Sequence, residues 1–344
     1  MAPRTCAAAA VLTTLLLAGC GSGAADKAGG PAAPVVLTLA DSDNNDQPST
    51  AAVRHFAARV EQLSGGSLRV RVTFDAAGMD TPRVEQRTIG MVKGGRFDLG
   101  VVGARAWDEL GFTSFRALQA PFLITSTRLL NHVLESPIAA EMLASLKEQD
   151  VVGLALVPDH LRRPVGFGHA FVSLSDFAQG RIRFLPSKTT AALLRTLGAT
   201  PIEASNADVG QEVSDGRING EEMTFFNSPG NSIVTGNIVF FGKALSFFAN
   251  SGAFDGLSTK RQQYLRAAAA ETTTYAAAHN PSELGFDRCP DRRRVVLASA
   301  ADVHAVERAA QPVSAQLEAD PVTKRYIDRI AAIKATLREG GVPL

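Results

Sequence analysis

The chain has 344 residues, of which 45% are hydrophobic and 20% charged, and 35 Lys and Arg residues against 34 Asp and Glu residues give a net charge of +1. This length suits one large domain or two lobes with a sizeable core. The balanced charge argues against a nucleic-acid-binding protein, three cysteines are too few for a disulfide scaffold or a four-cysteine zinc site, and the composition excludes a multi-span membrane protein.

The N-terminal residues resemble a targeting segment. Residues 7–18 are apolar apart from two threonines, are too few to span a bilayer, and lead to Leu17-Ala18-Gly19-Cys20. Small residues before a cysteine are typical of a lipoprotein cleavage site. We therefore expect residues 1–19 to be a signal peptide, Cys20 to carry lipid, and residues 20–34 to form a flexible tether, since they are rich in Gly, Ala and Pro. The alternative is an ordinary signal peptide with a chance cysteine.

Short strands and helices alternate in the first part of the body. Apolar residues recur at helical spacing in residues 50–63, which Gly65-Gly66 follow, whereas residues 68–74 alternate as in a half-buried strand. The expected strands cover residues 35–39, 68–74 and 97–102, and the expected helices cover 50–63 and 84–93. This order predicts right-handed crossovers and a largely parallel sheet.

The second part continues in the same style. The expected strands cover residues 151–157, 180–184, 218–223 and 295–297, and the expected helices cover 140–149, 189–197, 205–215, 258–279 and 322–338. Residues 233–250 are almost wholly apolar or small and could be read as a membrane span. Because Gly, Asn and Lys interrupt this run, we expect instead a pair of strands that crosses between two lobes.

The sequence carries no recognisable catalytic motif. Its six histidines form no metal-binding spacing, and no nucleophile elbow or phosphate-binding loop is present. Glu221 and Glu222 would face opposite sides of a strand, so they are poor candidates for an acid–base pair, and we expect at least one at the surface or a hinge. The charged residues 159–163 fit a lobe crossover or a polar loop equally well. We expect no enzyme activity, no cofactor and no metal.

Residues 174–201 contain an aspartate, a glycine, a basic strand ending in Arg183, and a helix closing in Leu-Gly-Ala-Thr-Pro. These motifs resemble those of the solute-binding proteins of tripartite ATP-independent periplasmic (TRAP) transporters, the dicarboxylate-binding family. Weaker matches lie, in the same order as in the family, at residues 94–99, 120–123, 216–222 and 253–258. Together they cover nearly the whole chain from residue 35.

The resemblance implies a two-lobed α/β periplasmic-binding-protein fold with hinge strands and a long inter-lobe helix. We expect one lobe to comprise residues 35–165 and 240–285, and the other to comprise residues 166–239 and 286–344. The implied function is the capture of a small organic acid in the cleft between the lobes and its delivery to a TRAP-type membrane permease. The protein would be extracytoplasmic, anchored to the membrane by its lipid, with no nucleic-acid partner.

The family's anchoring arginine corresponds to Arg183. A guanidinium matches both oxygens of a carboxylate, and each hydrogen bond to a charged group contributes about 1.5–3 kcal/mol. Micromolar binding needs about 8 kcal/mol, so lobe closure and the other cleft walls would supply the rest. The alternative for Arg183 is a structural salt bridge at a strand end. Arg181 is expected to face solvent.

Departures from the family pattern affect the expected ligand. His169 stands where relatives often have a basic residue, Met223 where many have asparagine, and Gly103 where some have an acidic pocket residue. Arg105 and Trp107 are close by, and Trp107 fits a pocket wall or the core. These changes put simple C4-dicarboxylates in doubt and favour a larger or more apolar acid, or a changed ligand. The candidate ligand-binding residues are Arg183, His169, Met223, Trp107, Gly103, Arg105 and Asn227.

Two other kinds of binding protein remain open. An ABC-type receptor shares the lobed fold, and a neighbouring gene for an ATPase would favour it. A sensory lipoprotein could keep the fold without transport, and a neighbouring sensor kinase in place of a permease would favour that reading.

Overall fold

A computed structural model describes residues 33–225, 232–279 and 294–339, with side chains to residue 337. The chain divides into a unit of residues 1–33 and a unit of residues 34–344, and the described helices and strands all belong to the second. Cys20 and Asn227 lie outside the described residues, as do the expected signal peptide and most of the expected tether.

The described strands join into one mixed sheet. Its order is β2-β1-β3-β9-β4-β7-β5-β6, and β8 pairs with β4 and with β10. The strands are β1 (Val35–Asp41), β2 (Leu68–Thr73), β3 (Leu99–Gly103), β4 (Val151–Gly166), β5 (Arg181–Phe184), β6 (Thr200–Glu203), β7 (Gly220–Thr224), β8 (Ile233–Thr235), β9 (Phe241–Asn250) and β10 (Arg294–Val296).

The helices pack on both faces of this sheet. They are α1 (Thr50–Leu63), α2 (Val84–Lys93), α3 (Ala106–Glu109), α4 (Thr127–Glu135), α5 (Pro137–Ala144), α6 (Leu174–Ala178), α7 (Lys188–Thr196), α8 (Val209–Ser214), α9 (Ser251–Asp255), α10 (Thr259–His279), α11 (Ala300–Ala309), α12 (Gln311–Glu318) and α13 (Pro321–Glu339), with 3₁₀ helices η1 (Arg116–Gln119) and η2 (Ser145–Gln149).

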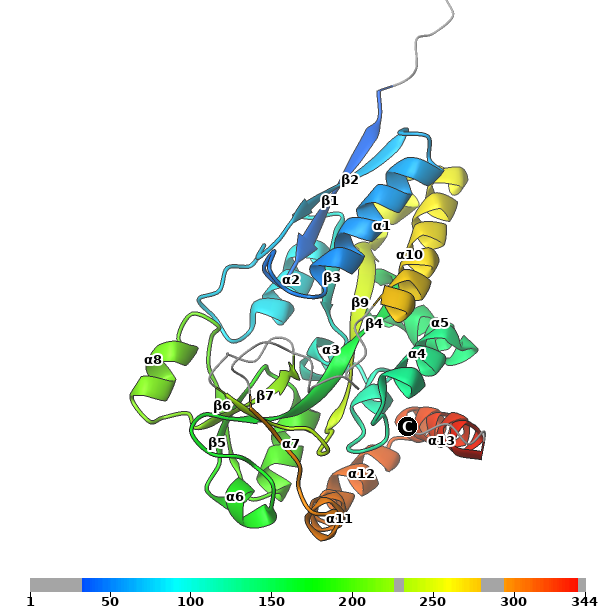
Figure 1. The fold of residues 1–344 in the computed structure, drawn as a ribbon. Helices are drawn as coiled ribbons and strands as arrows, with labels where there is room; N and C mark the ends of the chain where they lie inside the picture. The colour runs from blue at the N-terminus through cyan, green and yellow to red at the C-terminus, as the bar shows by residue number, and fades with distance from the viewer. Residues whose placement is uncertain (1–32, 226–231, 280–293, 340–344) are drawn as a thin grey trace, which may run out of the picture. The chain divides into compact units, whose positions relative to one another are not determined.

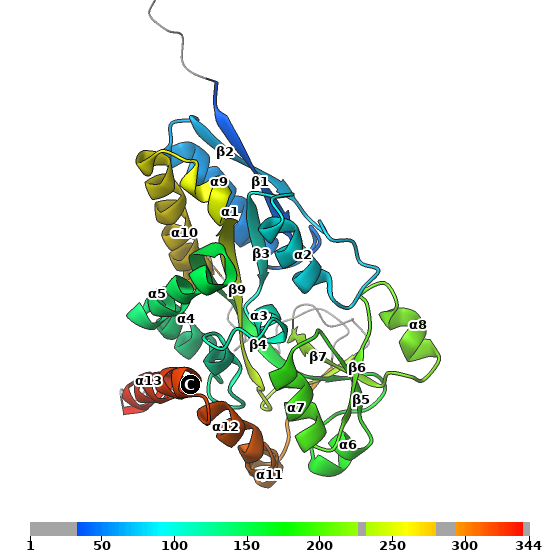
Figure 2. The ribbon, with the colours of Figure 1, turned by 180° about the vertical axis from the view of Figure 1, so that it is seen from behind.

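The first three strands run parallel and form the scaffold for one half of the sheet. Helices α1 and α10 cover one face and α2 lies on the other (Figures 1 and 2). The buried residues Ala52, Phe56 and Val60 of α1 recur every four positions, as the helical pattern predicts. They pack with the sheet and α10 into one hydrophobic cluster.

The other half of the sheet is smaller. Strand β5 runs parallel to β6 and β7, and the buried side chains of β5 and α7 pack with those of α6 and α11. Helix α13 packs elsewhere, against α4 and η1, where Tyr326 and Ile330 join the cluster formed around Trp107 and Val102.

Strands β4 and β9 link the two halves. They pair antiparallel along most of their length, and β9 also pairs with β3 while β4 also pairs with β7. Crossing strands were expected, but β4 extends over sixteen residues rather than seven, and its charged segment 159–163 is strand rather than loop. All five of these residues are buried, and neighbouring strands pair with Leu161, Arg162 and Arg163, while the register of β4 against β9 shifts between Pro158 and Leu161.

The mixed α/β, two-lobed fold class is confirmed. The parallel order holds within each half, and the antiparallel pairs come from the strands that cross between the halves. Among the described residues, no helix combines the length and the apolar character needed to traverse a bilayer, and residues 233–250 form β8, β9 and their connection instead.

Candidate functional site

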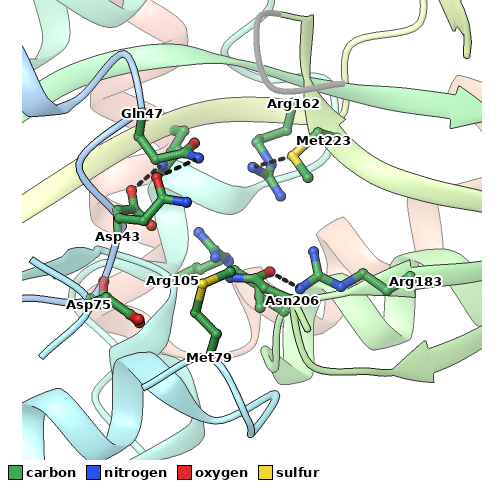
Figure 3. Close-up of a pocket in the computed structure, with 13 residues that line it drawn as sticks. Asp43, Gln47, Asp75, Met79, Arg105, Arg162, Arg183, Asn206 and Met223 are labelled. Carbon is green, nitrogen blue, oxygen red and sulfur yellow. Dashed lines mark hydrogen bonds and ion pairs between the residues drawn. The ribbon is translucent and has the colours of Figure 1, made fainter. Parts of the chain in front are cut away.

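A polar cavity of about 150 Å³ lies where the two halves of the sheet meet (Figure 3). Several strands end at it, which is the place where α/β sheets commonly bind ligands. Its wall carries four basic, two acidic and several amide side chains. The lining residues are Ser42, Asp43, Asn44, Gln47, Asp75, Met79, Arg105, Arg162, Arg183, Leu185, Asn206, Met223 and Lys243.

The parallel strands place the lining residues on two sides. Residues 42–47 follow β1, residues 75–79 follow β2 and Arg105 follows β3, so the carboxyl ends of three parallel strands supply one side. Arg183 lies on β5 and Asn206 follows β6, and these form the other side. In Figure 3 the guanidinium groups of Arg105, Arg162 and Arg183 turn toward the same space.

Arg183 is held firmly in this wall. Its side chain is 1% exposed, and Nη1 lies 2.6 Å from Glu221 Oε1. Nε donates to the carbonyl of Ala204 at 3.1 Å, and Nη2 donates to Asn206 Oδ1. These contacts fix the guanidinium at the cavity rather than in solvent. Arg181, two residues earlier on the same strand, is exposed as expected.

The adjacent carboxylates Glu221 and Glu222 each pair with a different arginine. Glu221 pairs with Arg183, and Glu222 pairs with Nε and Nη2 of Arg162. Neither lies at the surface, since they are 2% and 0% exposed, so of the two expected places only a hinge remains. Burial raises the pKa of Glu221 against the opposing effect of Arg183, whereas Arg162 outweighs burial and lowers the pKa of Glu222.

Arg105 occupies space that a side chain at position 103 would take. Its Nη2 lies 3.0 Å from Glu85 Oε2, while Glu85 Oε1 accepts the Gly103 N–H at 2.9 Å. A Cβ on Gly103 would lie 2.6 Å from Arg105 Nη1 and 2.6 Å from Glu85 Oε1. Position 103 therefore requires glycine, because Arg105 and Glu85 approach its Cα too closely for a side chain. The Arg105 guanidinium lies where some relatives have an acidic side chain at this position.

A fourth cation, Lys243, lies between two carboxylates. Its Nζ is 2.7 Å from Asp159 Oδ2 and 3.3 Å from Asp43 Oδ2, and His160 Nδ1 contacts Asp159 Oδ1. Burial opposes ionisation, but Lys243 and His160 hold the pKa of Asp159 well below its usual range, and Asp159 in turn raises the pKa of Lys243. Burial and the neighbouring Asp43 raise the pKa of Asp41 well above its usual range.

The structure brings together some of the sequence-predicted residues. Arg183, Arg105 and Met223 line the cavity, and Gly103 lies directly beside Arg105. Trp107 lies in the core instead, where its Nε1 donates to Ser246 Oγ at 2.8 Å.

His169 is half-buried against Phe171 and is not among the residues that line this cavity.

The sequence patterns missed most of the polar wall. Arg162 and Lys243 lie within β4 and β9, where charged residues in apolar strands gave the only signal. Asp43, Asn44 and Gln47 follow β1 in a segment rich in polar residues, which alone does not distinguish a binding loop from a solvated one.

The chemistry of this wall suits an oxygen-rich ligand. Guanidinium and ammonium groups donate to carboxylates, and the carboxylates and amides of Asp43, Asn44, Gln47 and Asp75 can accept from or donate to hydroxyls. Within the described ranges, no group of three or more His, Cys, Asp or Glu side chains is arranged to hold a metal ion.

Most of this chain matches one known protein family. Residues 39–316 match the family model "Bacterial extracellular solute-binding protein, family 7". A curated relative, the uncharacterised protein YiiZ of Salmonella typhimurium, is 24% identical over 193 residues, which cover 56% of this chain. The aligned region spans 57% of that relative, little more than half its length.

Solved structures with the same fold include several binding proteins with bound acids. The sugar acid binding protein DctPAm of Advenella mimigardefordensis, in complex with galactonate, has a TM-score of 0.72 at 17% identity and covers 88% of this chain and 98% of its own. A TRAP periplasmic solute-binding protein of Ralstonia eutropha with (S)-2-acetolactate reaches 0.75 at 16% identity, covering 88% and 99%. One from Xanthobacter autotrophicus with β-D-galacturonate reaches 0.72 at 21% identity, covering 86% and 99%.

Proposed function

Because the chain belongs to bacterial extracellular solute-binding protein family 7, we propose that it captures a small organic acid in the cavity around Arg183 and delivers it to a TRAP-type membrane permease. The observation that carries the proposal is the convergence of Arg105, Arg162, Arg183 and Lys243 on one cavity. The protein acts by binding and release and not as an enzyme.

Arg183 anchors the ligand's carboxylate in this proposal. Its partner Glu221 is buried, and burial raises the pKa of that carboxyl, so the charge on Glu221 is poorly stabilised. A ligand carboxylate can therefore share the Arg183 guanidinium, which has five N–H donors. The side chain needs no reorganisation to do so, since Asn206 and the Ala204 carbonyl already hold it.

The sequence suggested a larger or more apolar acid, or a changed ligand, and the polar wall favours a larger, hydroxylated acid over a more apolar one. Asp43, Asn44, Gln47 and Asp75 offer hydroxyl partners on the side opposite Arg183. The solved relatives with galactonate and galacturonate bind ligands of this kind, which makes sugar acids the first class to test.

The lobe assignment expected from the sequence, residues 35–165 with 240–285 and residues 166–239 with 286–344, stays part of the proposal. Strands β4 and β9 serve as the hinge, since they alone among the described strands run through both halves. The packing of α13 against α4 favours moving the C-terminal helix to the first lobe.

The membrane anchor is a separate part of the proposal. Cys20 carries lipid after the signal peptide is removed, and the protein stays outside the cytoplasm, tethered through residues 20–34. Expression of Cys20→Ser in the native host should move the protein from the membrane fraction to the soluble extracytoplasmic fraction. Equal membrane recovery of variant and wild type would disprove the anchor without touching ligand binding.

The first test is a thermal unfolding screen of the purified protein with D-galactonate, D-galacturonate, (S)-2-acetolactate and succinate. An acid present at one hundred times its Kd should stabilise the wild type by about 2.7 kcal/mol. Arg183→Gln should reduce the affinity at least tenfold, and Arg181→Gln, on the same strand but exposed, should leave it unchanged. The double variant Arg183→Gln/Glu221→Gln avoids a buried unpaired carboxylate and should bind no better. If both Arg183 variants are stabilised by the acid as strongly as the wild type, Arg183 does not anchor the ligand.

A further inference from the structure

Arg105 leaves more hydrogen bonds unmade than the other arginines of the cavity. It is 3% exposed, and only its Nη2 approaches a carboxylate, that of Glu85, at 3.0 Å. Its Nε and Nη1 are both buried and have no hydrogen-bond partner among the described residues. A buried donor left without an acceptor costs folding free energy, which a ligand oxygen placed there would restore.

The other two guanidinium groups differ in this respect. All three nitrogens of Arg183 donate to protein oxygens. Arg162 uses Nε and Nη2 on Glu222, and its Nη1 approaches Met223 Sδ at 3.9 Å. Arg105 is therefore the arginine of this wall whose donors most lack an acceptor.

The surroundings of Arg105 are built to hold it there. Glu85 fixes the guanidinium through one carboxylate oxygen and accepts the Gly103 N–H through the other. The absence of a side chain at Gly103 leaves room for Nη1, since a Cβ there would lie 2.6 Å from that atom. Glu85, Gly103 and Arg105 thus form one cradle, which we name the Arg105 cradle.

The Arg105 cradle and Arg183 belong to different sides of the cavity. Arg105 follows β3 and stands with Asp43 and Met79, whereas Arg183 lies on β5 beside Asn206 (Figure 3). A ligand whose carboxylate is held by Arg183 would turn its other end toward Arg105. An acceptor oxygen at that end would meet Nε or Nη1, and a methyl group would leave both unsatisfied.

We propose that Arg105 binds a second oxygen-bearing group of the ligand, a hydroxyl or a second carboxylate, and thereby selects difunctional acids over monofunctional acids of the same length. This inference rests on the proposed function, because it takes Arg183 as the anchor of the first carboxylate. Arg105 is then a specificity-determining residue, and the discrimination arises from the cost of leaving its donors unpaired.

The test is isothermal titration of matched acids into wild type and Arg105→Gln. The pairs are succinate with butyrate and D-galactonate with hexanoate. Arg105→Gln should weaken the binding of a difunctional acid at least tenfold and change that of its monofunctional partner less than threefold. A merely structural role would weaken both members of a pair alike, and that result, or an unchanged affinity for the difunctional acids, would overturn the proposal.

Two further variants keep the test independent of folding defects. Glu85→Gln/Arg105→Gln removes the ion pair as a unit and should show the same selective loss. Gly103→Ala should also weaken the binding of the difunctional acids selectively, because its methyl group displaces Arg105 Nη1. Gly90→Ala, with open space around it, should leave the affinities for all four acids unchanged. If wild type binds none of the four acids and no sugar acid, the proposed function fails. If Arg183→Gln abolishes binding and Arg105→Gln does not alter selectivity, only this inference fails.

Discussion

At the residue scale, the cavity keeps its cations in place by pairing each with a buried carboxylate. These pairs are Arg105 with Glu85, Arg162 with Glu222, Arg183 with Glu221 and Lys243 with Asp159. The charges are therefore nearly balanced before a ligand arrives, and their geometry is preorganised. Such pairs contribute little net stability, yet removing one partner is costly, since the other charge stays buried.

Lys243→Met tests this reasoning on the pair with the clearest pH dependence. Removing the ammonium 2.7 Å from Asp159 should destabilise the protein by about 3–5 kcal/mol at pH 7, measured by urea unfolding. Asp159 has a lowered pKa in the folded wild type. The stability that its ionised carboxylate contributes is therefore fully present above the pKa of Asp in the unfolded chain, about 4, and is lost as the pH falls below that value.

The penalty of Lys243→Met should accordingly shrink between pH 7 and pH 4, because burial without the ammonium raises the pKa of Asp159 and the carboxyl is then protonated in the variant. Lys324→Met, on the exposed face of α13, is the matched control, and its small effect on the free energy of unfolding should be the same at both pH values, because solvent screens the ion pair of Lys324 with Asp328. A penalty for Lys243→Met that stays constant with pH would contradict the assignment.

Only part of this site could be predicted from the sequence. Arg183 was found through its motif, and Arg105 through its place after a strand that lacks the family's acidic residue. Arg162 was missed because its partner Glu222 lies sixty residues further along the chain. Lys243 was missed because its partner Asp159 belongs to the segment 159–163, whose sequence fits a loop as well as a strand. Pairing across strands depends on register, which one sequence does not reveal.

At the element scale, Asp108 of α3 holds the N-terminus of α7. Its Oδ2 accepts the Thr189 N–H at 2.8 Å, the Thr189 hydroxyl at 3.0 Å and the Ser187 hydroxyl at 3.2 Å. The carboxylate thus satisfies a free N–H of the first turn and interacts favourably with the helix dipole. The contact ties the segment after β3, which carries Arg105, to the helix that follows β5.

Asp108→Ala should therefore destabilise the protein by about 2–3 kcal/mol in chemical denaturation, since it removes charged hydrogen bonds and the ion pair with Arg116. Asp328→Ala, which removes an exposed carboxylate paired with Lys324 one helical turn away, should cost about 0.3–0.5 kcal/mol. Equal effects of the two substitutions would show that Asp108 does not fix α7.

The elements differ in how far the sequence determines them. Helices α1 and α2 begin and end where their apolar spacing and the following glycines predict. The strand predicted at residues 151–157 was shorter than β4, because charged residues follow it at 159–163. These charged side chains can be buried in an extended strand only because they find partners in the folded protein. Local pattern governs the amphipathic helices, whereas the crossing strands depend on tertiary contacts.

At the scale of the whole molecule, the proposed ligand site lies between two halves that share β4 and β9. The segments at its edge already touch, since Met79 O accepts the Ala207 N–H at 3.3 Å and Arg83 pairs with Glu203 at 3.1 Å. Opening and closing of the proposed site would therefore break and remake these surface contacts, each of which contributes little, and also the buried hydrogen bonds between Asp108 and the start of α7.

The decisive measurement is a crystal structure of the complex with the acid that most raises the unfolding temperature. We predict that acid in the cavity, with its carboxylate within hydrogen-bond distance of Arg183 and a second oxygen within reach of Arg105. An acid bound elsewhere on the protein, with both guanidinium groups making no contact to it, would contradict the proposed capture of the ligand between the two halves.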